Sequence, residues 1–151
     1  VLVDYPAPAT ERAILALSRL ETSNQPNIPI KPLTQATLLA ARQQVSEVHM
    51  ADAVEEYLVQ IILATRNAKQ YGMELSQWLD YGASPRATIA LDRCSRALAW
   101  MDNRDFVTPD DVRSVAHDIL RHRLILSFEA EASGITSNKV IDTLLAVVPC
   151  A

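Results

Sequence analysis

Apolar residues recur at helical spacing along most of this 151-residue chain. The widest apolar stripe lies between Ala51 and Tyr71, where residues three and four positions apart would share one face of a helix. This pattern predicts a long helix that ends at Gly72, because glycine readily adopts the left-handed conformation found just after helices. The predicted buried face of this helix consists of Val54, Tyr57, Leu58, Ile61, Ile62 and Thr65.

Five further segments show the same periodicity or begin with a helix-capping pattern. They predict helices over residues 9–21, 34–45, 84–102, 108–120 and 137–148. In the helix over 84–102, the predicted buried residues are Ala87, Ala90, Leu91, Cys94, Leu98 and Met101.

Extended patterns are short by comparison. Residues 1–3 are apolar and two of the three are β-branched, which suits a strand whose partners we expect outside this chain. Residues 124–126 predict a second extended piece, and residues 78–82 predict a connection between helices. Prolines at 26, 29 and 32 disfavour helix and predict a linker over 23–33. The pattern therefore predicts an all-α fold of about six helices.

The composition narrows the class of protein. With 49% hydrophobic residues and no apolar run near the roughly 20 residues of a membrane span, we expect a cytoplasmic protein without such a span. A formal charge of −4, spread along the chain, argues against a nucleic-acid partner.

Cys94 and Cys150 are isolated in the sequence, and Cys94 is predicted to be a small buried residue. His49 and His117 lack neighbours at ligand spacing, so no metal site is predicted.

Two predicted helix starts share a Ser/Thr-Pro pattern but differ in charge. Residues 108–111 read Thr-Pro-Asp-Asp, which gives a capping side chain, a proline that needs no amide partner and two carboxylates near the positive end of the helix dipole. Residues 84–86 read Ser-Pro-Arg, and a cation in the first turn is disfavoured by up to ~1 kcal/mol. Either Arg86 extends into water, or it and the backbone amides of the helix start form an anion site.

Other cations have structural alternatives as well. Arg93 and Arg96 would lie on nearly the same helix face as Arg86 and could extend a basic stripe, or they could pair with Asp92 or with acids on a neighbouring helix. The Arg-His-Arg run at 121–123 lies at a predicted helix C-terminus, where cations complement the dipole, so a capping role suffices there.

Taken together, six short motifs in this order resemble the lid of MoxR-family AAA+ ATPases. They are Asp4-Tyr5-Pro6, Ala64-Thr65-Arg66, Gly82-Ala83-Ser84-Pro85-Arg86-Ala87, Asp105-Phe106-Val107-Thr108-Pro109-Asp110-Asp111-Val112, Arg121-His122-Arg123-Leu124 and the tail from Ile141 to Pro149. The resemblance spans nearly the whole chain. It implies that residues 1–22 are the end of an α/β ATPase core and its exit helix, that 23–33 are a linker and that 34–151 are the helical lid.

The resemblance also implies a binding role for the start of one helix. Arg86 matches the sensor 2 arginine, which reaches the phosphates of ATP, with Ser84 and Pro85 beside it. The implied partners are the chain's own ATPase core, which would hold Mg²⁺, the neighbouring subunits of a hexameric ring and a protein with a von Willebrand factor type A domain. The implied activity is chaperone-like remodelling or maturation of client complexes.

This chain has no phosphate-binding Gly-x-x-x-x-Gly-Lys loop, because none of its three glycines is followed by lysine. We therefore predict no catalytic residue in this chain and no ATP bound to the chain alone. A function of a different class is a stand-alone helical adaptor that binds partner proteins through an amphipathic groove without nucleotide.

Overall fold

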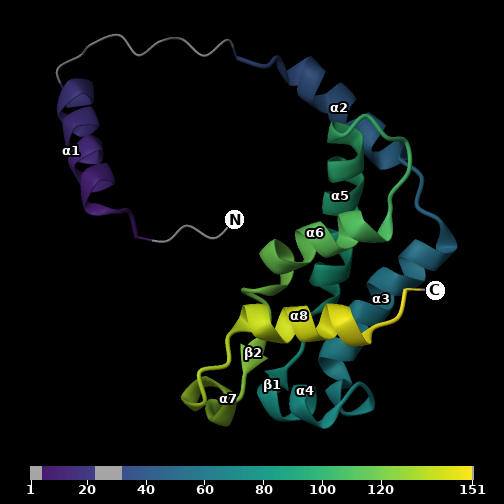
Figure 1. Cartoon of the computed structure of the whole chain (residues 1–151). Helices are drawn as coiled ribbons and strands as arrows, with labels where there is room; N and C mark the ends of the chain where they lie inside the picture. Colours follow the sequence, from purple (N-terminus) through teal and green to yellow (C-terminus); the bar gives the residue numbers. More distant parts are fainter. Residues whose placement is uncertain (1–4, 23–31, 151) are drawn as a thin grey trace. The chain divides into compact units, whose positions relative to one another are not determined.

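The computed structural model describes residues 5–22 and 32–150, which divide into two compact units, Val1–Leu38 and Leu39–Ala151 (Figure 1). In the first unit, helix α1 (Pro8–Thr22) has no buried residue, and Ile14, Leu17 and Leu20 are each about half exposed. The strand predicted at residues 1–3 and most of the predicted linker, residues 23–31, lie outside the described part of the chain.

Helix α2 (Gln35–Glu47) begins where its sequence predicts. The Thr34 side-chain oxygen accepts a hydrogen bond from the Thr37 amide at 3.1 Å, so Thr34 caps this helix as expected. The boundary between the two units falls within α2, and none of its residues is buried.

The core of the second unit is built from four longer helices, α3 (Asp52–Arg66), α5 (Pro85–Met101), α6 (Pro109–Leu120) and α8 (Ser137–Val147). Helix α5 contacts both α3 and α6, and α8 contacts α3 and α6, so the four enclose one apolar interior (Figure 1). Helices α5 and α6 are direct neighbours, joined by the short connection over residues 102–108. Every residue of the predicted α3 face is buried: Val54, Tyr57, Leu58, Ile61, Ile62 and Thr65.

The end of α3 corrects the sequence prediction. The helix stops at Arg66 instead of Tyr71, and it is followed by a 3₁₀ turn, η1 (Ala68–Gln70), and by the short helix α4 (Met73–Trp78). Gly72 does have a positive φ of 142°, but with ψ at 152° it is extended and precedes α4, so it does not end α3 in the left-handed helical conformation.

A two-stranded antiparallel sheet lies beside these elements. Strand β1 (Leu79–Tyr81) pairs with β2 (Ile125–Leu126), which confirms the extended piece predicted at 124–126. Strand β1 was predicted only as a connection, and the helix α7 (Phe128–Ala132), capped by Ser127, was not predicted. These short elements carry too few residues for a periodic pattern.

The buried face of α5 also differs from the prediction. Ala87 and Leu91 are buried as expected, but the face continues through Ser95 and Ala99, while Cys94 is exposed and Met101 is 63% exposed. Three of these four buried residues are small, which allows the neighbouring helices to approach closely along this face instead of the face with more apolar side chains. Cys94 is therefore not the small buried residue that its apolar neighbours predicted.

Helices dominate the described residues, so the predicted all-α class is confirmed, and the short two-stranded sheet is an addition to it. The six predicted helices correspond to α1, α2, α3, α5, α6 and α8. Over residues 5–22 and 32–150, none of the helices is long and apolar enough to cross a membrane.

Candidate functional site

The start of α5 is open to solvent. Ser84 is the N-cap residue, with an extended backbone, but its side chain makes no capping hydrogen bond. Pro85 occupies the first helical position and Arg86 the second, and all three residues are exposed. Within the described part of the chain, the Arg86 side chain makes no hydrogen bond or ion pair. A guanidinium, a hydroxyl and the Arg86 amide are thus available together at one surface point, since Pro85 has no amide hydrogen and the Ala87 amide donates to the Ser84 carbonyl at 2.8 Å.

The segment before α5 is attached to the end of α3. A Cβ placed on Gly82 would lie 2.4 Å from the Thr65 carbonyl oxygen, so only glycine permits this close approach. The Ala83 amide donates to the Thr65 side-chain oxygen at 2.9 Å, and Arg66 Nε donates to the Ala83 carbonyl at 2.8 Å. Thr65 in turn donates to the Ile62 carbonyl at 2.7 Å. Both backbone groups of Ala83 are therefore bound by α3, immediately before the open helix start.

The start of α6 is closed by its own side chains. The Thr108 hydroxyl accepts from the Asp111 amide at 3.4 Å, and the Asp111 carboxylate accepts from the Thr108 amide at 2.7 Å, which completes a capping box. Arg104 donates to both carboxylate oxygens of Asp111, at 2.6 and 2.7 Å, and also to Asp102 at 3.1 Å. The predicted cap at Thr108 is confirmed. Arg104 is a further member of this hydrogen-bond network, and the sequence did not indicate it.

This network changes the ionisation of its members. The hydrogen bonds from Arg104 lower the pKa of Asp111 from its ordinary 3.8 to about 2, and the bonds from Thr108 act in the same direction, while burial opposes them. The same contact with Asp111, followed by that with Asp102, raises the pKa of Arg104. The side chains of Thr108 and Asp111 at the start of α6 are therefore occupied by each other and by Arg104.

Of the other arginines on α5, one has a structural role and one does not. Arg96 donates to Asp92 at 2.7 Å and to the Val48 carbonyl, so it ties α5 to the segment after α2. Arg93 is exposed, and no hydrogen bond or ion pair involves it in residues 5–22 and 32–150. The alternative of pairing with Asp92 is therefore correct for Arg96, and the possible basic stripe contains only Arg86 and Arg93.

The cations after α6 act as predicted for a helix C-terminus. Arg123 donates to the Ile119 carbonyl in the last turn of α6. Arg121 binds Asn138 at 2.8 Å and Asp118 at 3.2 Å, which links the end of α6 to the first turn of α8. Among the described residues, no group of three or more His, Cys, Asp or Glu side chains could hold a metal ion.

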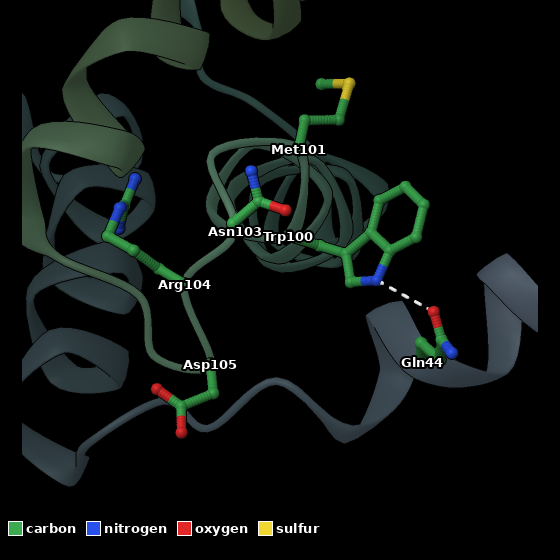
Figure 2. A pocket seen from close by; sticks show the side chains of 6 residues that line it. All are labelled: Gln44, Trp100, Met101, Asn103, Arg104 and Asp105. Atoms are coloured by element: carbon green, nitrogen blue, oxygen red, sulfur yellow. Dashed lines mark hydrogen bonds between the residues drawn. The ribbon is translucent and has the colours of Figure 1, made fainter.

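An open hollow of about 770 Å³ lies at the other end of α5 (Figure 2). The Trp100 indole donates to the Gln44 side chain at 3.1 Å along its wall, and Asp105 is another of the residues that line it. The guanidinium of Arg104 points away from this space and already binds Asp111. The hollow is roughly 22 Å along the helix from Arg86, since α5 rises about 1.5 Å per residue. It therefore does not belong to the open helix start and has no free cation for an anionic ligand.

Sequence reasoning identified Ser84, Pro85 and Arg86, which the structure places together at one helix start. It placed Thr65 on the buried face of α3 and quoted Gly82 and Arg66 only within family motifs, so it did not predict that these three residues hold the preceding segment. A glycine two residues before a Ser-Pro helix start was the available signal for this close backbone approach.

Several known proteins are similar to this chain in sequence. Residues 75–144 match the model of the AAA lid domain. The chain is 35% identical to the chaperone MoxR1 of Mycobacterium tuberculosis, over 97% of this chain and 38% of that protein. It is 30% identical to the protein MoxR of Paracoccus denitrificans, over 99% of this chain and 47% of that protein. The chain thus spans less than half the length of these relatives.

A crystal structure of a candidate ATPase from Cytophaga hutchinsonii has the same fold. The match has a TM-score of 0.84 at 34% sequence identity, and it covers 99% of this chain and 45% of the other.

Proposed function

The chain belongs to the MoxR family of AAA+ ATPases, as a C-terminal lid region, and on this premise we propose that it closes over ATP bound by an ATPase core. Arg86 would contact the phosphates of the nucleotide as the sensor 2 residue, with Ser84 and Pro85 beside it. Movement of the lid would then couple hydrolysis to chaperone-like remodelling of a client complex.

One observation carries this proposal: α5 begins without a side-chain cap, and its exposed Arg86 side chain has no partner among the described residues. Helix N-terminal amides and a guanidinium fork both favour an anion, and phosphate oxygens accept bonds from each. The α6 start shows that this chain can close a Ser/Thr-Pro start with its own carboxylate. At α5 the corresponding position, three residues after the cap, is Ala87. Its side chain has no carboxylate that could occupy the place of an anionic ligand.

The remaining chemistry belongs to the rest of the proposed enzyme. ATP hydrolysis requires a phosphate-binding loop, Mg²⁺ and a positioned water, which an ATPase core would supply. Assembly into a hexameric ring in the cytoplasm, and action beside a protein with a von Willebrand factor type A domain, complete the proposal. In this scheme the present chain contributes a phosphate contact and no catalytic base.

The test compares two exposed arginines of α5 in the complete ATPase. Arg86→Ala should lower the turnover number on the order of 30- to 1000-fold, which corresponds to losing one charged contact to the transition state. Arg93→Ala is the matched control, because it removes the same side chain seven residues further along the same helix. Turnover should change less than twofold in the control. A wild-type turnover number for Arg86→Ala would make Arg86 an ordinary surface residue and leave the helical adaptor as the better account.

A further inference from the structure

The open start of α5 raises the question of what fixes its position. Its first turn has no side-chain cap, so the segment before it determines where Arg86 points. That segment is attached through the close approach of Gly82 to Thr65 and through the two hydrogen bonds of Ala83. Ala83 is buried, and only two residues separate it from Arg86.

We propose that Arg66 is a positioning residue for Arg86, acting through its hydrogen bond to the Ala83 carbonyl. The proposal rests on the function proposed above for Arg86. Thr65 binds the amide of Ala83, and Arg66 binds the carbonyl of the same residue. Together they fix this peptide segment from both sides, so the direction of the first turn of α5 is set by the last turn of α3.

The chemistry of arginine fits this role. The Nε–H lies in a rigid plane with the two Nη groups, so one donor can bind the backbone while the others remain outside. Arg66 is exposed, and its only hydrogen bond within residues 5–22 and 32–150 is the one to Ala83. Its side chain also borders a hollow of about 350 Å³ that Thr65 and Gly82 line, so the guanidinium is accessible at the surface.

Two substitutions separate the hydrogen bond from the size of the side chain. In Arg66→Gln, the amide nitrogen stands at the same number of bonds from Cα as Nε, so it can donate to the Ala83 carbonyl without a charge. Arg66→Met has a similar length and no donor. A role in positioning through Nε predicts that Gln preserves the wild-type behaviour and Met does not.

The first measurement is amide hydrogen exchange in the complete protein without nucleotide. In Arg66→Met, the amides of Ala83 and Ala87 should exchange on the order of tenfold faster, because one charge-assisted hydrogen bond no longer holds the segment. In Arg66→Gln they should exchange at nearly the wild-type rate. Wild-type exchange in the Met variant, or equally fast exchange in the Gln variant, would overturn the proposal.

The second measurement is a double-mutant cycle on ATP turnover. Arg66→Met should lower the turnover number by roughly tenfold in the wild-type background and should have no further effect once Arg86 is Ala. Equal losses in both backgrounds would show that Arg66 does not act through Arg86, and so would contradict the proposal. If Arg86→Ala itself hydrolyses ATP at the wild-type rate, the proposed function fails, and the exchange experiment alone decides whether Arg66 positions the start of α5.

Discussion

The two Ser/Thr-Pro helix starts of this chain have nearly the same sequence pattern but differ in how their polar groups are bound. At α6, Thr108 and Asp111 satisfy each other, and Arg104 binds the carboxylate from outside. At α5, Ser84 makes no capping hydrogen bond, and Arg86 has no partner among the described residues. The contacts that hold this helix start are made by the preceding residues, Gly82 and Ala83. A helix start whose side chains cap its own first turn stabilises the fold. A helix start that is held by contacts of the preceding segment keeps its polar side chains free for a ligand.

The largest expected loss of stability comes from opening the closed start. Asp111→Asn should lower the free energy of unfolding by about 3 kcal/mol, because it leaves Arg104 without its buried carboxylate. Asp110→Asn is the control, since its carboxylate is 88% exposed and lies 3.9 Å from Arg113. Urea denaturation of both variants measures the difference. Equal stability of the two variants would show that the capping network does not hold this turn.

The attachment of the open start should be nearly as sensitive to substitution. Gly82→Ala should cost up to about 3 kcal/mol, because the new methyl group overlaps the backbone of Thr65 and the end of α3 must shift. Chemical denaturation of the variant tests this, with its circular dichroism spectrum as the check on folding. A variant as stable as the wild type would mean that the two segments separate without cost.

The closed start also predicts how stability depends on pH. The pKa of Asp111 is about 2 in the folded chain and near its ordinary 3.8 when unfolded, so folding favours the ionised form. The resulting contribution, about 2 kcal/mol, is complete above pH 4 and is lost as the pH falls through 2. Melting temperatures measured between pH 2 and pH 6 should show this acid loss in the wild type. An equally steep loss in Asp111→Asn would assign it to other carboxylates.

The smallest effects compare the two caps directly. Thr108→Ala should cost about 1 kcal/mol, the usual value for a side-chain cap. Ser84→Ala should change the stability by only a few tenths of a kcal/mol, because its hydroxyl caps nothing. Equilibrium unfolding of this matched pair gives both values. A larger cost for Ser84→Ala than for Thr108→Ala would reverse the comparison.

Much of this comparison was predictable from sequence because it depends on neighbouring residues. Caps, a proline at the first helical position and charges in the first turn act within four residues, so 84–86 and 108–111 could be identified directly. Periodicity likewise predicted the buried face of α3, since its large apolar residues have a single consistent spacing.

Contacts between distant segments were not predictable in this way. The bond from Arg66 to Ala83 joins residues 17 apart, and the pairing of β1 with β2 joins strands separated by α5 and α6. The exposure of Cys94 follows from helices that pack closely along Ala87, Leu91, Ser95 and Ala99, which periodicity alone cannot distinguish from the adjacent apolar face. Each of these features depends on which elements meet in space.

The most direct test of the account is the melting temperature of Arg86→Ala in the complete protein, with and without Mg²⁺ and a slowly hydrolysed ATP analogue. Without nucleotide, the variant should melt at or slightly above the wild-type temperature, because a cation is removed from the positive end of a helix. With the analogue, the wild type should be stabilised markedly and the variant much less, because the phosphate contact is gone. A variant destabilised without nucleotide, or stabilised by the analogue as strongly as the wild type, would contradict the account.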